Sequence, residues 1–291
     1  MYINEICEQI SFCNIKLYAD DAKIYSATDR AFSTFEVAQD LQSIEWFLYD
    51  WQLKLNADKC EVMHIGRNNP LSPYYLNGEQ LRCVESCSDL GVRVSNELSV
   101  RLHCTTIARN ASYRLKQLNT AFVCKERSFK VHMFKTYVRP LLEYNAQVWS
   151  PSYLNEIDTV ERVQRRFSKF MPGLWEVPYL TRLQILGLES LELRRIVFDL
   201  VYMYKLVYGF IDVDFTDLFI SNTRVTRGHD LKVRMQRCNV NCRKHFFCNR
   251  VSKIWNSLPH DVVSSSSVDK FKSKLGTIDL SVYCKGRAYT V

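Results

Sequence analysis

The pattern of apolar and polar positions divides the chain into a front part with strand-like periods and a longer part with helical periods. Between Cys13 and Ser26, two short runs rich in β-branched and aromatic residues flank the tetrapeptide Tyr18-Ala19-Asp20-Asp21. Such runs on either side of polar residues are typical of a β-hairpin. We therefore expect a strand, a tight turn at the aspartates and a second strand.

The next segments predict one helix and a small group of strands. Ser33 and Glu36 have the spacing of a capping box, and apolar residues then recur every three or four positions as far as Trp51. That helix should end before Asn56. Further on, Asn77-Gly78 is a strong hairpin signal. Short strands are expected at 60–65, 74–76, 80–83 and 90–94.

Beyond about residue 97 the apolar positions recur with the period of long helices. These helices are expected at 108–122, 128–148, 155–170, 191–208 and 268–275. Pro140 should kink the second of them, because it lacks a backbone N–H. In the third, Ile157, Val160, Phe167 and Phe170 share one face, which indicates the side that packs in a core.

Charge is distributed unevenly along the 291 residues. Residues 1–100 carry 8 Lys and Arg against 15 Asp and Glu, a net charge of −7, whereas residues 101–291 carry 31 against 16, a net charge of +15. A strongly basic body suits a polyanionic partner such as a nucleic acid.

Composition narrows the class of protein further. A hydrophobic content of 47% and a charged content of 24% are those of an ordinary globular protein. The most apolar stretch, 196–211, is interrupted by Asp199 and Lys205, so we expect no membrane partner. The first residues lack the features of a secretory signal. We therefore expect the eleven cysteines to be reduced thiols and the protein to be intracellular, in the nucleus or the cytoplasm.

Asp20 and Asp21 are the candidate chemistry of the predicted hairpin. Polymerases hold two Mg²⁺ ions, about 3.5–4 Å apart, on fixed carboxylates, and a hairpin turn presents such ligands on a rigid base. The alternative is a chance Asp-Asp turn whose side chains bond their own backbone.

Basic residues gather at two places in the second part of the chain. Four cations on the third predicted helix lie three or four residues apart, opposite its apolar side: Arg162, Arg165, Arg166 and Lys169. The segment 221–257 carries nine Lys and Arg against one acid, a net charge of +8. Its candidate contacts for nucleic acid are Arg237, Arg243, Lys244 and Arg250. Both sets can follow a phosphate backbone, and a plain solvated basic surface is the alternative.

The same basic segment contains the residue types of a zinc site, namely Cys238, Cys242, His245 and Cys248. Their spacing does not match that of a common finger or knuckle. A helix through 241–255 would instead place three of them near one packed face. We therefore favour ordinary packing over zinc.

A series of longer motifs runs through almost the whole chain. These are Tyr2–Glu5, Tyr18–Asp21, Trp51–Cys60, Asp89–Val92, Tyr137–Tyr144 with Trp149, Glu161–Phe167, Thr226–His229, Arg250-Val251 and Ile254–Pro259. In this order and spacing they resemble the second half of the reverse transcriptase of a non-LTR (LINE-type) retrotransposon of the jockey-like kind. The resemblance extends from the catalytic hairpin through the thumb to the C-terminal region.

The resemblance implies roles for the residues at matching positions. Asp20 would ligate Mg²⁺ directly, with Asp21 as its supporting partner. Lys59 would act near the departing pyrophosphate as an acid or charge stabiliser, and a solvated lysine is the alternative. A primer grip would be formed by Leu90, Gly91 and Val92. A simple strand bend at Gly91 is the alternative there.

The resemblance also implies an α+β fold in three parts. A partial palm of antiparallel hairpins and one helix is expected at 1–97, a helical thumb or connection region at 98–210, and a basic C-terminal region at 211–291. The implied activity is RNA-directed DNA polymerisation, with an RNA template and a DNA primer as partners and Mg²⁺ as cofactor.

The resemblance also implies that parts of such an enzyme are missing. Only seventeen residues precede Tyr18, so we expect the upstream metal-binding aspartate and the Gly-containing nucleotide-selecting loop to be absent. The expectation is a truncated polymerase that is inactive alone and binds Mg²⁺ weakly or not at all. The rival hypothesis is a catalytically dead nucleic-acid-binding remnant of a mobile element, and a chain with no selected function is a third.

Overall fold

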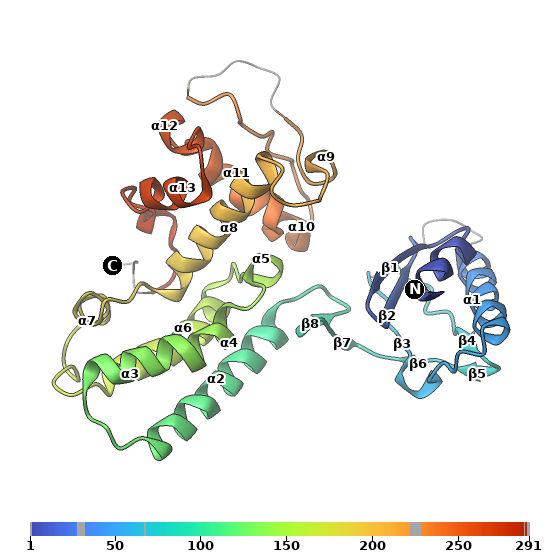
Figure 1. Ribbon diagram of the computed structural model, residues 1–291, viewed down its shortest axis with the longest axis horizontal. Helices are drawn as coiled ribbons and strands as arrows, with labels where there is room; N and C mark the ends of the chain where they lie inside the picture. Colours follow the sequence, from blue (N-terminus) through green and yellow to red (C-terminus); the bar gives the residue numbers. More distant parts are fainter. Residues whose placement is uncertain (1, 28–32, 67, 222–227, 288, 290–291) are drawn as a thin grey trace. The chain divides into compact units, whose positions relative to one another are not determined.

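The computed structural model describes residues 2–27, 33–66, 68–221, 228–287 and 289 (Figure 1). The chain divides into two compact units, Met1–Leu98 and Ser99–Val291. The first unit combines helices with short strand pairs, and the second is almost entirely helical. The α+β fold predicted from the sequence is confirmed.

The first unit contains one long α-helix and eight short strands among its described residues. Its elements are η1 (Tyr2–Gln9), β1 (Asn14–Tyr18), β2 (Asp21–Tyr25), α1 (Ser33–Asp50), η2 (Ala57–Lys59), β3 (Glu61–Val62), β4 (Tyr75–Leu76), β5 (Glu79–Gln80), β6 (Arg82–Cys83), β7 (Ser86–Asp89) and β8 (Val92–Ser95). Antiparallel hairpins join β1 to β2, β4 to β5 and β7 to β8, whereas β3 pairs with β6 in parallel. The expected strand 60–65 is therefore wrong in length, because only two of its residues find a partner strand.

The core of this unit lies between α1 and the β1–β2 hairpin. Ile44, Phe47 and Leu48 on α1 are buried, and the alternating residues Leu17 and Ile24 of the two strands pack against them. Because side chains alternate across a strand and recur every three or four residues on a helix, one face of each element enters this core. Trp51, which was expected on the apolar face, lies beyond the end of α1 and is exposed.

The second unit is built from helices. They are α2 (Arg101–Ala121), α3 (Arg127–Met133), the π-helical segment η3 (Phe134–Val138), α4 (Arg139–Glu143), α5 (Ala146–Trp149), α6 (Leu154–Lys169), α7 (Tyr179–Leu186), α8 (Leu191–Val207), α9 (Phe215–Leu218), α10 (Asn241–His245), α11 (Phe247–Ser257), α12 (His260–Val263), α13 (Val268–Leu275) and the short η4 (Ser281–Tyr283). Helices α6, α8 and α13 agree with their predicted ranges within one residue, whereas α2 begins seven residues before the predicted start.

The predicted helix 128–148 is divided around Pro140 into α3, η3, α4 and α5. The helix widens into η3 immediately before the proline, and the N–H of Arg139 bonds to the carbonyl of Phe134, five residues back. This π-type bond lets the helix continue past a residue that has no N–H to donate. The break comes later, at Asn145, whose φ of +52° is left-handed.

A buried carboxylate fastens α8 to α6. Glu161 on α6 accepts hydrogen bonds from the backbone N–H groups of Leu191 (3.1 Å) and Glu192 (3.2 Å) at the start of α8. Ser190 completes this N-cap by accepting the N–H of Leu193. Burial raises the pKa of Glu161, although these donors and the Tyr179 hydroxyl oppose the rise.

The C-terminal motifs form part of the core of the second unit. Trp255 of α11 is fully buried, and its indole N–H donates to the carbonyl of Leu231. His229 packs edge-on against the same indole, and its Nε2 lies 3.0 Å from the Trp255 carbonyl oxygen. Residues 222–227, which include half of the Thr226–His229 motif, lie outside the described residues.

Among the residues that the structure describes, none of the helices has the length and apolar character needed to cross a membrane.

Candidate functional site

The two candidate aspartates lie at the tip of the β1–β2 hairpin. Tyr18 pairs with Asp21 across the hairpin, so Ala19 and Asp20 are the two turn residues. Ala19 has a φ of +53°, a left-handed value that such two-residue turns require. Asp20 and Asp21 are both exposed. The hairpin predicted from the sequence is confirmed, and its tip presents two adjacent carboxylates to solvent.

A buried carboxylate that the sequence analysis missed holds the base of this hairpin. Asp40 on α1 is only 1% exposed. It accepts three backbone N–H groups from the segment before β1: Ser11 at 2.9 Å, Phe12 at 3.0 Å and Cys13 at 2.7 Å. Burial opposes its ionisation, but the three donors outweigh burial and lower the pKa of Asp40 below its ordinary value of 3.8. The available signal was an acid on the apolar stripe of α1, three residues after Val37.

The expected primer-grip residues lie in a second hairpin that is tied to the first. Lys23 on β2 forms an ion pair with Asp89, the last residue of β7. Asp89 pairs with Val92, so Leu90 and Gly91 are turn residues, with φ values of +45° and +82°. The predicted continuous strand over these residues is therefore wrong, since both turn positions need left-handed backbone. Val92 begins β8 and is buried.

Lys59 ends the short η2 turn and is exposed. It forms no ion pair with Asp20 or Asp21 in the described part of the chain. Its role in catalysis therefore stays a prediction.

The hairpin offers only part of a metal site. No group of three or more His, Cys, Asp or Glu side chains that could hold a metal ion occurs among the described residues. Mg²⁺ can nevertheless bind through one or two carboxylates when waters and substrate phosphates complete its octahedron. Asp20 and Asp21 therefore fit a Mg²⁺ that is shared with a nucleotide, and they do not fit a site made of protein ligands alone.

The predicted basic face of α6 lies on the outer side of that helix. Arg162 and Arg166 are exposed, and Lys169 is half-buried. Arg165 is partly engaged within the fold, with its Nη2 3.5 Å from Asp158 and its guanidinium 5.1 Å from the ring centre of Tyr179. Three of the four predicted cations are thus available for a phosphate backbone.

Exposed aromatic rings adjoin these cations, a feature that the sequence analysis missed. Phe170, expected in the core, is 58% exposed, and Trp175 is 55% exposed, with their ring centres 5.2 Å apart in a T-shaped arrangement. The Lys169 ammonium lies 4.5 Å from the Trp175 ring centre, and the Arg166 guanidinium lies 5.9 Å from that of Phe170. We call Arg162, Arg166, Lys169, Phe170 and Trp175 the α6 platform. Rings interleaved with cations are the surface composition that stacks unpaired bases.

The predicted basic residues of the C-terminal segment do not act as one group. Arg237, Arg243 and Lys244 are exposed, and Arg243 donates to the side chain of Gln236 at 3.0 Å. Arg250 instead points into the fold. Its guanidinium forms two hydrogen bonds to the buried carboxylate of Asp199, at 2.7 and 2.9 Å, and a third to the Gln147 carbonyl at 2.6 Å. The donors of Arg250 are therefore engaged within the fold, and its contact with nucleic acid stays a prediction.

The candidate zinc ligands have separate surroundings. The structure divides the predicted helix at Phe246 into α10 and α11. Cys248 is buried, and burial raises the pKa of its thiol. Cys238 accepts a hydrogen bond from the Asn249 amide at 3.2 Å, and His245 packs edge-on against Tyr153.

Two curated proteins show similarity to this chain. Over 165 residues, which are 53% of this chain and 18% of the relative, the chain is 26% identical to the RNA-directed DNA polymerase from the mobile element jockey of Drosophila melanogaster. It is 22% identical over 164 residues to the protein of the same description from Drosophila funebris, again covering 18% of that relative. The chain thus spans about a fifth of the length of these relatives. No protein-family model and no solved structure matches the chain. The two similarities support a reverse-transcriptase-like region, of the kind found in non-LTR elements, over about half of this chain.

Proposed function

We propose that this chain takes part in RNA-directed DNA synthesis as a portion of a non-LTR retrotransposon polymerase. The observation that carries the proposal is the β1–β2 hairpin, whose tip presents Asp20 and Asp21 and whose base is held by Asp40. In such a reaction the 3′-hydroxyl of a primer attacks the α-phosphate of a nucleotide, and pyrophosphate leaves. Both relatives are named as RNA-directed DNA polymerases.

The hairpin would supply the carboxylates for this chemistry. A Mg²⁺ bound there would neutralise charge on the transferring phosphate and orient it. Asp20, in the turn, would face the nucleotide phosphates, and Asp21 would support it from the first position of β2. The ion pair between Lys23 and Asp89 would keep the Leu90-Gly91 turn beside β2, where a primer strand could contact backbone that has no side chain at Gly91.

Alone, the chain should bind nucleic acid without extending a primer. The described residues around the hairpin contribute two carboxylates, and a third ligand would have to come from outside them. Mg²⁺ affinity is therefore expected to be weak until a nucleotide adds its own phosphates.

A second candidate function is nucleic-acid binding without catalysis, and the α6 platform favours it. The platform lies in the second unit and does not depend on the aspartates. Its cations would contact phosphates, and Phe170 and Trp175 would stack unpaired bases. This is the function expected of a mobile-element remnant that has lost polymerase activity.

Primer extension and binding assays on the full chain test both functions together. An RNA template annealed to a labelled DNA primer is incubated with the protein, Mg²⁺ and deoxynucleotides, and binding is followed by fluorescence anisotropy at several salt concentrations. We expect binding that weakens with salt, and no extension. The triple variant Arg162→Gln, Arg166→Gln and Lys169→Gln removes the three platform cations. For a single-stranded RNA, each phosphate contact contributes about 0.7 to the slope of log Kd against log salt. The triple variant should therefore lower this slope by about 2.

A matched control removes the same charge from the exposed side of α2. Arg109, Arg114 and Lys116 are two arginines and one lysine, all exposed, and their replacement by Gln should leave the slope nearly unchanged. An equal loss in the control would contradict a role for the platform. Extension that Asp20→Asn abolishes would contradict the inactivity and establish the polymerase. Absence of both extension and binding would overturn both proposals.

A further inference from the structure

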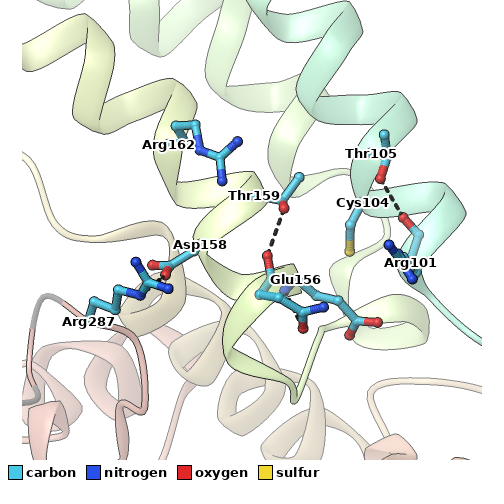
Figure 2. A pocket seen from close by; sticks show the side chains of 9 residues that line it. Arg101, Cys104, Thr105, Glu156, Asp158, Thr159, Arg162 and Arg287 are labelled. Carbon is cyan, nitrogen blue, oxygen red and sulfur yellow. Dashed lines mark hydrogen bonds and ion pairs between the residues drawn. The ribbon is translucent and has the colours of Figure 1, made fainter.

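A polar pocket lies between the first turns of α2 and α6 in the second unit (Figure 2). Its volume is about 260 Å³, many times the ~10–15 Å³ that one water needs, so it can admit a small organic ligand. Figure 2 shows Arg101 and Thr105 entering from α2, Glu156 and Thr159 from α6, and Arg287 from the segment near the C-terminus.

The inner part of the pocket offers hydrogen-bond acceptors. Glu156 lines the pocket and is only 6% exposed, and its Oε2 is buried without a hydrogen-bond partner. The Thr105 hydroxyl donates to the carbonyl of Arg101 at 2.9 Å (Figure 2), and the Thr159 hydroxyl donates to that of Asn155 at 2.7 Å, which leaves both hydroxyl oxygens free to accept. Burial raises the pKa of Glu156, and the charge of Arg101 opposes that rise.

The outer part of the pocket is cationic. Arg287 forms an ion pair with Asp158 at 2.8 Å, and Arg165 lies 3.5 Å from the other oxygen of the same carboxylate, so the charge of Asp158 is already neutralised. Arg101 and Arg162 form no ion pair in the described part of the chain. Among the described residues that line the pocket, Glu156 is the one remaining acid opposite these two cations. The pocket therefore has an excess of positive charge at its rim and hydrogen-bond acceptors inside.

This distribution excludes a simple cation or a simple anion. A divalent cation would need several converging carboxylates, but of the two described acids that line the pocket Asp158 is already paired with Arg287 and Arg165, which leaves Glu156 alone. A phosphate alone would be repelled by the Glu156 carboxylate. A ligand that presents N–H donors at one end and a phosphate at the other fits both parts.

We propose that this pocket binds a single guanine nucleotide, with the base against Glu156 and the phosphate against Arg101 and Arg162. Guanine is the base whose Watson–Crick edge presents two adjacent N–H groups, and one carboxylate can accept both. Arginine suits the phosphate because its planar fork donates two hydrogen bonds at once.

The pocket adjoins the surface that the proposed function uses. Arg162 lines the pocket and also begins the α6 platform, so a single strand stacked on Phe170 and Trp175 could continue along α6 and place one unpaired guanine inside. For a guanine that is part of a bound strand, this inference rests on the proposed function. For a free guanine nucleotide, it does not depend on the proposed function.

Ligand-observed NMR and calorimetry on the full chain test the pocket. The probes are GMP, guanosine, IMP, AMP and inorganic phosphate. GMP should bind best. IMP, which lacks the exocyclic amine, should bind about tenfold more weakly, because it loses one hydrogen bond to a charged acceptor. Equal binding of GMP, IMP and AMP would overturn the proposal.

Variants separate the two ends of the ligand. Glu156→Gln should lower GMP affinity about tenfold or more and remove the preference over IMP, whereas Glu176→Gln, an exposed glutamate beside Trp175, should change neither. Arg162→Gln should weaken GMP binding but not guanosine binding, which lacks the phosphate. Circular dichroism confirms that each variant is folded. If Glu156→Gln does not fold, the comparison of GMP binding with guanosine binding in Arg162→Gln tests the proposal by itself.

Two oligonucleotides distinguish the failure of this inference from failure of the proposed function. A single-stranded RNA of adenines should bind through the platform, and the same RNA with one central guanine should bind about tenfold more tightly. If both bind equally and GMP does not bind, the pocket is not a guanine site while nucleic-acid binding stands. If neither RNA binds but GMP does, the pocket recognises free nucleotides only and the platform proposal fails.

Discussion

Replacing Asp40 with Asn should loosen the hairpin that carries the candidate metal ligands. The Asp40 carboxylate accepts the backbone N–H of Ser11 on Oδ1 and the backbone N–H groups of Phe12 and Cys13 on Oδ2. An Asn side chain has one acceptor oxygen. Its best orientation keeps the Phe12 and Cys13 donors and turns its NH₂ group toward the N–H of Ser11.

The magnitude follows from these three contacts. Two hydrogen bonds to a charged acceptor become bonds to a neutral one, at a cost of about 1 kcal/mol each. The third donor is left buried without a partner, which costs about 1–3 kcal/mol. We therefore expect Asp40→Asn to lower the free energy of unfolding of the first unit by about 3–5 kcal/mol. Asp50→Asn, at the exposed end of the same helix, should change it by less than about 0.5 kcal/mol.

Urea denaturation of the full chain, with hydrogen exchange measured on peptides from residues 9–25, gives both the global and the local effect. Because the pKa of Asp40 is lowered on folding, its contribution is present above its unfolded value of about 3.8 and is lost as the pH falls through the lower folded value. The difference between wild type and Asp40→Asn should therefore be constant near neutral pH and shrink below pH 3.8. Unchanged exchange at residues 11–13 in the variant would refute this account of how α1 holds the hairpin.

Three further predictions concern single side chains. Arg250→Met should destabilise the second unit by about 3–5 kcal/mol in urea denaturation, because it removes the hydrogen-bonded cationic partner of the buried Asp199 carboxylate, and adding Asp199→Asn should restore part of the loss. A loss under about 1 kcal/mol would contradict the burial of this pair. Gly91→Ala should cost about 1 kcal/mol and speed hydrogen exchange in β7 and β8, since its φ of +82° disfavours a residue with a Cβ. Trp175→Ala should weaken binding of single-stranded RNA in an anisotropy assay by about 1–3 kcal/mol through the loss of one stacked base. Trp46→Ala, an exposed tryptophan on α1, is its control and should have no effect.

Local patterns in the sequence predicted the elements that depend on neighbouring residues. The hairpin at Tyr18–Asp21 follows from strand-forming runs around two turn residues, and α13 follows from a short helical apolar period. The face of α6 that enters the core was also predictable, because its apolar residues recur at helical spacing.

Features that depend on residues far apart in the sequence were not predictable. Asp40 and the donors it holds are 27 to 29 residues apart, and Arg250 is 51 residues from Asp199. An arginine in a basic segment has the same sequence signature whether it is solvated or buried against a distant aspartate. Phe170 continues the apolar period of α6 but lies beyond the end of the helix, so periodicity predicted burial for an exposed ring.

The most direct test of the central claim measures whether Asp20 and Asp21 bind a divalent cation together with a nucleotide. Electron paramagnetic resonance of Mn²⁺, used in place of Mg²⁺, gives the cation's affinity for the full chain with and without a deoxynucleoside triphosphate. We expect weak binding alone, tighter binding of the Mn²⁺–nucleotide complex, and a loss of about tenfold or more in that affinity in the double variant Asp20→Asn/Asp21→Asn. Asp50→Asn should bind as the wild type does. If the double variant binds the Mn²⁺–nucleotide complex as tightly as the wild type, the hairpin is not the metal site of a polymerase.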